Sequence, residues 1–252
     1  MPRYFIEFSY DGSKYHGIQK QPNSLTIQEI LETNISKYTR SDTSLTLAGR
    51  TDAGVHATQM FAHFDIDFEF DQNNFCRSLN MMIPKDICIE CLSSVKDDSH
   101  ARFDAINRTY EYYISYKKDP FNYKFSYYLK DNLDVNKMNL SCLRLLNHKN
   151  FKCFSKSNTD VKTYVCNIKH AEWVIIGNGL RFSIRANRFL RNMVRSIVGT
   201  MIEIGTYKIT DEEFQKILDS DDRSKAGYSV PASGLFLSNV TYKNIFETSW
   251  KK

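Results

Sequence analysis

The sequence has 252 residues, 42% of them apolar and 25% charged, which is ordinary for a globular chain of one large domain or two small ones. The net charge of 34 − 29 = +5 is mildly basic, so the chain is expected to bind a polyanion only if the excess gathers on one face. No apolar run approaches the roughly 20 residues that span a membrane, and MPRYFIEFSY lacks the apolar core of a signal peptide, so we expect a cytoplasmic protein with reduced thiols.

The first half of the chain alternates between strand and helix patterns. Thr26 and Glu29 form a capping-box pattern, and Ile27, Leu31 and Ile35 recur behind it at helical spacing. We expect strands at 3–10, 44–49, 59–68 and 86–95, helices at 26–39 and 73–82, and a loop at 10–25.

The stretch GRTDAGVHA (49–57) joins two of these strands and is dense in reactive side chains. Arg50 and His56 flank Asp52, while Gly49 and Gly54 allow a tight turn and the close approach of a substrate. The local pattern has two interpretations. It is either a catalytic loop built around a carboxylate or a solvated turn with an internal Asp–Arg pair.

The strand at 86–95 carries a CxxC pair, Cys88 and Cys91. A structural zinc site needs two further ligands at comparable spacing, and residues three apart on a strand point to opposite faces. The four other cysteines are scattered singly: Cys76, Cys142, Cys153 and Cys166. We therefore expect no metal site, no redox role and no disulfide framework.

The second half repeats the same types of element. Residues 163–176 and 180–186 read as a hairpin about Gly177–Gly179, and Thr210 with Glu213 forms another capping box. We expect strands at 108–117, 163–176, 180–186 and 235–242, and helices at 134–147, 188–204 and 210–220. The fold class is therefore α+β, with two similar lobes at 1–105 and 106–252, mainly antiparallel sheets and helices on one face.

Two patterns in this half suggest contact with a polyanion. Tyr110, at the start of an alternating strand, could offer its ring to a base, although alternating aromatics usually belong to a core. Arg188, Arg191 and Arg195 fall at i, i+3 and i+7 of the expected helix, so they are predicted to share one face beside its apolar stripe. Such a row is either a solvated flank or a site for phosphates or a carboxylate.

Taken together, these residues resemble the tRNA pseudouridine synthase A family over almost the whole length. Seven blocks carry the resemblance in order: YDGSKYHGIQKQ (10–21), AGRTDAGVHA (48–57), SLNMMIPKDI (78–87), HARFDAINRTYEYYI (100–114), NFKCFSK (150–156), NRFLRNMVRSIVGTMIEIG (187–205) and VPASGLFL (230–237). Asp52 matches the nucleophilic aspartate of that family, Tyr110 its active-site tyrosine, and Arg195 the arginine that pairs with the aspartate.

The resemblance implies a pseudouridine synthase fold with a central active-site cleft, and isomerisation of uridine to pseudouridine. Asp52 would be held ionised by a salt bridge to Arg195, and Tyr110 would stack on the uracil. Asp52 would attack the sugar C1′, attack the base at C6, or remove a sugar proton, and the sequence leaves these three routes open. No cofactor and no metal are implied, in keeping with the lack of a P-loop, dinucleotide fingerprint or zinc spacing.

The implied partner is tRNA, bound by a homodimer at uridines 38, 39 and 40 of the anticodon stem-loop, with no membrane association. The target uridine must flip out, and Arg50 would fill the space that it leaves. Thr51 and His56 would complete the substrate contacts of the loop. RNA would be read mainly through phosphates and shape, with candidate contacts at Lys14, Lys20, Arg77, Lys162, Arg188 and Arg191.

Two other classes of function stay open from the residues alone. An RNA-binding protein without turnover would bind tRNA and yield no pseudouridine. An enzyme acting on a small molecule through Asp52 and His56 would show no salt-dependent affinity for tRNA.

Overall fold

The computed structural model describes residues 1–67, 71–156 and 161–243, so the last residue of the strand expected at 59–68 lies outside the described residues. The chain forms two compact units. Met1–Ile106 and the segment that begins at Leu237 make the first, and Asn107–Phe236 makes the second. The chain therefore returns to its first unit after completing the second.

The first unit is a sheet in the order β4-β1-β3-β9, built from β1 (Arg3–Tyr10), β3 (His56–Asp65), β4 (Ile87–Val95) and β9 (Leu235–Tyr242), which enters this unit at Leu237. The pairs β1–β3 and β1–β4 are antiparallel, and the short β2 (Thr46–Leu47) pairs with β3 in the same sense. A β-bulge at Glu90 shifts the register between β1 and β4.

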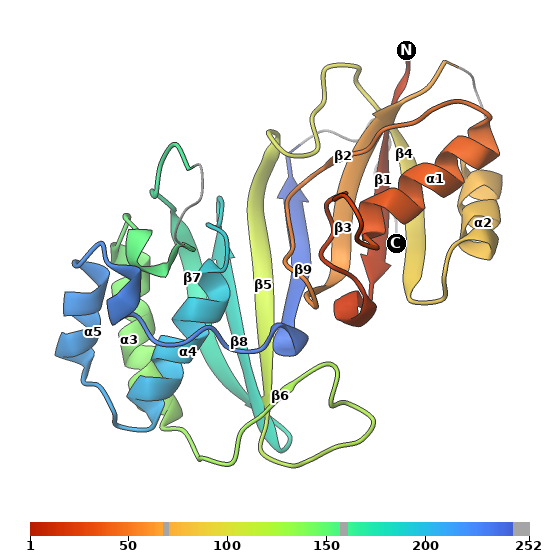
Figure 1. Ribbon diagram of the computed structural model, residues 1–252. Helices are drawn as coiled ribbons and strands as arrows, with labels where there is room; N and C mark the ends of the chain where they lie inside the picture. Colours follow the sequence, from red (N-terminus) through yellow and green to blue (C-terminus); the bar gives the residue numbers. More distant parts are fainter. Residues whose placement is uncertain (68–70, 157–160, 244–252) are drawn as a thin grey trace. The chain divides into compact units, whose positions relative to one another are not determined.

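One face of this sheet is covered by α1 (Ile27–Thr39) and α2 (Gln72–Met82), and Figure 1 shows α1 lying across the strands. Phe64 of β3 stacks on Tyr4 of β1 at 6.0 Å and on Phe75 of α2 at 6.1 Å. Tyr38 of α1 meets Phe75 edge-on at 5.0 Å. The two helices therefore bury the same face of the sheet, because rings from both join one aromatic cluster.

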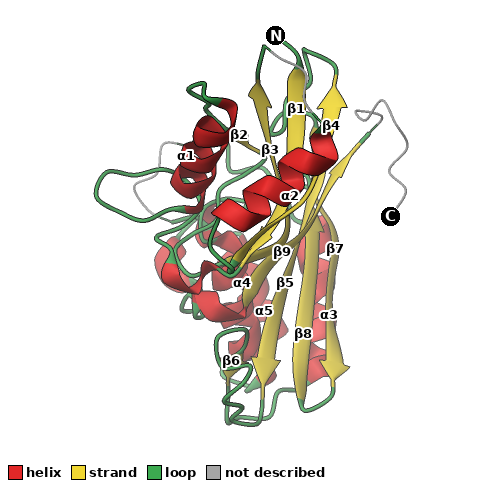
Figure 2. Ribbon diagram, turned by 90° about the vertical axis from the view of Figure 1, so that its right-hand side faces the viewer, coloured by secondary structure: helices red, strands yellow, loops and turns green. Residues whose placement is uncertain are grey.

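The second unit has the strand order β5-β8-β7, from β5 (Ala105–Ser115), β8 (Gly179–Ala186) and β7 (Ile168–Ile176), and β6 (Tyr127–Tyr128) pairs parallel to β5. Both long pairings are antiparallel, and β7 and β8 form the hairpin expected about Gly177. Figure 2 shows the three long strands side by side.

Side chains alternate cleanly between the two faces of this second sheet. Tyr112, Phe182 and Trp173 lie in one register row and are buried, whereas the next row, Glu111, Ser183 and Glu172, is half-buried or exposed. The helices α3 (Val135–Asn147), α4 (Met193–Gly205) and α5 (Asp211–Leu218) pack on one another, and α3 packs along β7. The predicted α+β class with mainly antiparallel strands is confirmed.

Candidate active site

The loop that carries Asp52 leaves β2 and enters β3 through a tight turn. The Val55 N–H donates to the Asp52 carbonyl at 3.1 Å, and Gly54 sits at the third position of this turn with φ +76°. A positive φ at that position favours glycine, which explains the residue found there. The turn leaves Asp52 half-buried and Arg50 exposed, while Thr51 between them is buried.

The segment 10–18 holds this loop through side-chain and backbone hydrogen bonds. The hydroxyl groups of Tyr10 and Thr51 lie 2.7 Å apart in a buried setting. Ile18 N–H donates to the Thr51 carbonyl at 3.3 Å, and Gly54 N–H donates to the Tyr15 carbonyl at 3.3 Å. The residues on both sides of Asp52 are therefore fixed to a neighbouring segment of the chain.

Two glycines let the segments approach this closely. A Cβ on Gly12 would fall 1.9 Å from the Val55 carbonyl oxygen, and one on Gly17 would fall 2.9 Å from that of Thr51. Gly17 also has φ +94°, which side chains rarely tolerate. The glycines of YDGSKYHG are thus explained by contact with the Asp52 loop, a role that sequence reasoning did not assign to them.

His56 begins β3 directly after the loop and is only 1% exposed. Its Nδ1 accepts the Gly12 N–H at 3.1 Å and lies 3.1 Å from Asp11 Oδ1. The buried His56 ring therefore links the start of β3 to the segment 10–18. Thr51 is linked to the same segment, because its hydroxyl is buried against that of Tyr10.

Tyr110 lies on β5 in the second unit, half-buried and opposite Ile184 of β8. Its ring meets Phe189 edge-on at 5.1 Å and an interplanar angle of 88°. This packing fixes the orientation of the Tyr110 ring through a residue of the arginine-bearing segment.

The arginine-bearing helix is shorter than the sequence pattern predicts. It begins at Met193 and not at Arg188, because Asn192 has a left-handed backbone with φ +66°. The Asn192 amide donates to Ser196 Oγ at 3.0 Å and to Ser229 Oγ at 2.6 Å, which stabilises that break. The expected helical face shared by Arg188, Arg191 and Arg195 is therefore wrong.

Arg195 alone of the three lies on α4, in its first turn, and is half-buried. Its Nε donates to the Val230 carbonyl at 2.7 Å, and the Val230 N–H donates to the Arg195 carbonyl at 3.3 Å. This two-way link joins two of the seven sequence blocks, and it fixes the guanidinium to the backbone of the segment that leads into β9.

The other candidate RNA contacts occupy varied positions. Arg188 is half-buried in the loop before α4, and Arg191 and Lys162 are exposed in the same unit. In the first unit Lys14 lies 3.5 Å from Asp86 and Lys20 lies 3.3 Å from Glu32, while Arg77 is exposed on α2.

The described residues hold neither a cluster of metal ligands nor a helix that could span a membrane. Within 1–67, 71–156 and 161–243, no three His, Cys, Asp or Glu side chains gather as a metal site would require. All six cysteines are free thiols. No helix in these ranges has the length and apolar character needed to cross a membrane.

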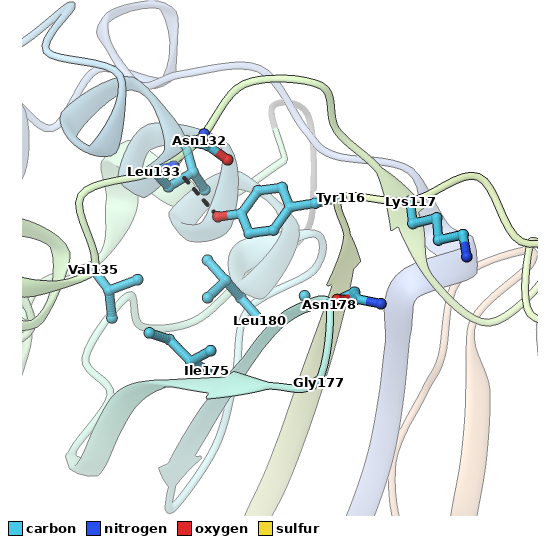
Figure 3. Close-up of a pocket in the computed structure, with 10 residues that line it drawn as sticks. Tyr116, Lys117, Asn132, Leu133, Val135, Ile175, Gly177, Asn178 and Leu180 are labelled. Atoms are coloured by element: carbon cyan, nitrogen blue, oxygen red, sulfur yellow. Dashed lines mark hydrogen bonds between the residues drawn. The ribbon is translucent and has the colours of Figure 1, made fainter.

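A cavity of about 500 Å³ lies in the second unit beside the β7–β8 turn. Figure 3 shows Tyr116 among the residues that line it, together with Ile175 and Leu180. The Leu133 N–H donates to the tyrosine oxygen at 3.3 Å. None of the candidate catalytic or substrate-binding residues lines this cavity, so it is separate from the candidate active site.

Comparison with known proteins gives the family of the chain. The family model described as tRNA pseudouridine synthase matches residues 7–104 and 144–243, which include the Asp52 loop and the Arg195 helix. The tRNA pseudouridine synthase A of Bacteroides fragilis is 49% identical, covering 97% of this chain and 98% of the relative. The tRNA pseudouridine synthase A of Bacteroides thetaiotaomicron is 48% identical, covering 100% of this chain and 95% of the relative. The tRNA pseudouridine synthase A 2 of Clostridium perfringens is 38% identical, covering 94% of this chain and 98% of the relative. The chain belongs to the tRNA pseudouridine synthase family.

Proposed function

We propose that this protein isomerises uridine to pseudouridine in the anticodon stem-loop of tRNA, at positions 38, 39 and 40, with Asp52 as the nucleophile. In this reaction the bond from C1′ to N1 breaks, the uracil turns, and a bond from C1′ to C5 forms. The hydrogen on C5 is released as a proton and N1 gains one, so no oxidant or reductant is required.

The observation that carries the proposal is the support of the Asp52 loop. The carboxylate is half-buried, and Thr51 and Gly54 on either side of it are hydrogen-bonded to the segment 10–18. A nucleophile held this firmly reacts faster than a mobile one, because its position is fixed before the substrate arrives. A solvated surface turn would need neither the buried Tyr10–Thr51 pair nor the two close glycines.

We propose the following roles for the remaining residues. Arg195 is the counter-ion of Asp52, and its link to Val230 fixes the direction of the guanidinium. Tyr110 stacks on the uracil, with its ring held by Phe189. Arg50 is exposed and takes the place of the flipped nucleotide, whereas Thr51 and His56 hold the loop. Arg188, Arg191 and Lys162 contact phosphates, and two copies of the chain bind tRNA together.

The test is release of tritium from tRNA carrying [5-³H]uridine. Asp52→Asn keeps the size of the side chain and removes its charge, so we expect no detectable release and a Kd for tRNA within about threefold of wild type. Asp42→Asn, an exposed carboxylate ahead of β2, is the matched control and should keep full activity. Turnover by Asp52→Asn would end the proposal, and tRNA binding without turnover by the wild-type protein would favour a binding protein instead.

A further inference from the structure

The segment 117–130 lies between β5 and α3, where Figure 1 draws it as a long loop around β6. Its large aromatic side chains are exposed to solvent. Phe121 is 87% exposed, Tyr123 63% and Tyr128 45%. Phe121 has the highest exposed fraction among the large apolar side chains of the described residues. Exposed rings gathered in one segment are characteristic of a binding surface rather than of an ordinary loop.

The same segment is basic. Residues 117–130 contain four lysines and one aspartate. That aspartate, Asp119, is engaged in the turn itself: its Oδ1 accepts the Phe121 N–H at 2.8 Å and its Oδ2 accepts the Asn122 amide at 2.7 Å. These hydrogen bonds lower the pKa of the Asp119 carboxyl, the Asn122 bond most. The carboxylate builds the turn that presents Phe121, and lysines flank the rings: Lys117, Lys118, Lys124 and Lys130.

The segment has a defined conformation, although its tip is exposed. Leu129 N–H donates to the Ser115 carbonyl at 3.0 Å, and Tyr127 pairs in parallel with Ile114 of β5. The Phe125 ring packs on Phe236 at a centroid distance of 6.2 Å. Buried and half-buried side chains thus anchor the segment while Phe121 and Tyr123 point outward. A segment whose backbone is already held in place loses less conformational entropy on binding than a mobile one.

We propose that the segment 117–130 is an RNA-binding surface that stacks unpaired nucleotides of the tRNA on Phe121 and Tyr123 while its lysines neutralise the adjoining phosphates. Interleaved aromatic and basic side chains are the arrangement with which proteins hold single-stranded nucleic acid. The surplus of lysine favours a polyanion over an apolar protein partner, whose contact region would be depleted in lysine. This inference rests on the proposed function for its substrate and uses none of the residues placed in the catalytic machinery.

The experiment compares Phe121→Ala/Tyr123→Ala with a matched control, Leu140→Ala/Leu143→Ala, in the full-length chain. The control removes two apolar side chains of the same unit that are 64% and 55% exposed but lie on α3, outside the basic segment. The probes are a tRNA transcript, a short single-stranded RNA and a fully paired RNA duplex. We expect the aromatic double variant to raise the Kd for tRNA and single-stranded RNA about tenfold or more, with no change for the duplex or in the control.

Two further variants separate stacking from simple apolar contact. Phe121→Trp keeps a ring and should retain affinity, whereas Phe121→Leu keeps apolar bulk and should not. Replacing Lys117 and Lys118 by Gln should reduce the slope of log K against log salt by roughly 1.4 for two phosphates on a single strand. Full retention of RNA affinity by Phe121→Leu would overturn the inference. Loss of self-association with unchanged RNA affinity in the aromatic double variant would overturn it in favour of a protein contact.

Failure of the RNA-binding role of the segment 117–130 can be distinguished from failure of the proposed enzymatic function. If wild-type protein releases tritium from tRNA and the aromatic double variant binds tRNA with unchanged Kd, the RNA-binding role of this segment is refuted and the enzymatic assignment stands. If the wild-type protein neither binds tRNA nor modifies it, both are refuted.

Discussion

Tyr10 supports the loop that carries Asp52 through its hydroxyl. It lies 2.7 Å from the hydroxyl of Thr51, the neighbour of Asp52, in a buried position. Tyr10→Phe should lower kcat about tenfold because the loop loses one of its fixed points, and should lower the free energy of unfolding by about 1 kcal/mol. Thr51→Ser keeps the hydroxyl and serves as the control in single-turnover kinetics. Wild-type kcat in Tyr10→Phe would show that this bond does not position the loop.

A buried histidine should make stability depend on pH. Burial of His63, strengthened by Arg3 and by His100, lowers its pKa to about 4. The unfolded chain therefore binds more protons than the folded one between about pH 6.5 and pH 4. Stability is fully present above pH 6.5 and falls as the pH drops through this window, by at most about 1.4 kcal/mol per pH unit from this residue.

Urea unfolding at several pH values measures this slope. His63→Asn should flatten it, whatever its effect on stability at pH 7, because the titrating group is gone. His100→Asn is the control, because the His100 ring lies 4.8 Å from that of His63. Asp104 opposes the lowering of the His100 pKa, so the pH dependence of stability should largely persist in this variant. An unchanged slope in His63→Asn would assign the acid sensitivity to other groups.

For single residues of the Asp52 loop, the sequence predicted the turn better than it predicted the contacts of each side chain. The pattern around Asp52 indicated a tight glycine turn, and Gly54 occupies such a position. It did not indicate that His56 is buried against Gly12 N–H, because that contact joins residues 44 apart in the chain. Composition within a loop says little about which of its polar groups face solvent.

Among the elements, those with local signals were predicted well. Thr210 and Glu213 form both halves of the expected capping box of α5, and the Thr26 hydroxyl accepts the Glu29 N–H at 3.4 Å at the start of α1. The hairpin about Gly177 was likewise readable from its glycines. Each of these features depends on residues within a few positions of one another.

The start of α4 was predicted wrongly for a physical reason. Apolar residues at 189, 190, 193 and 194 keep helical spacing, but periodicity does not report that Asn192 adopts φ +66°. The Ser229 hydroxyl that bonds the Asn192 amide comes from a distant part of the chain. Local propensity was therefore overridden by a tertiary contact.

This break gives a prediction about Asn192. Asn192→Gly loses the amide bonds but accepts the left-handed backbone, whereas Asn192→Ala loses the bonds and adds strain. We expect the wild type to be the most stable, Asn192→Gly to be less stable, and Asn192→Ala to be the least stable. About 1 kcal/mol should separate the two variants. Differential scanning calorimetry would measure this, and equal stability of the two variants would contradict the role of the backbone conformation.

The whole molecule is organised by a return of the chain that no local pattern reveals. Residues 237–242 of β9 join the first unit, beside β3, after the second unit is complete. The strand character of 235–242 was predictable from its alternation, but its partner was not, because Gln59 and Val240, which share a hydrogen bond, lie 181 residues apart. Pairings over such separations depend on the assembled sheet.

Tyr242 offers a test of whether the two units have separate stabilities. Its ring packs edge-on against Phe5 at 5.5 Å and Phe61 at 5.2 Å, and its hydroxyl donates to the Ala101 carbonyl at 2.5 Å. Because all these partners belong to the first unit, Tyr242→Ala should lower the stability of that unit by about 2 kcal/mol and leave the second unchanged.

Hydrogen exchange followed amide by amide resolves the two units. In Tyr242→Ala, protection from exchange should fall in β1 and β3 and persist in the β7–β8 hairpin. Tyr242→Phe loses only the hydroxyl, so the stability of the first unit should fall by about 1 kcal/mol. Equal loss of protection in both units would mean that they unfold as one cooperative body, because a local change would then be felt everywhere. Separate responses would instead mean that each unit has a stability of its own.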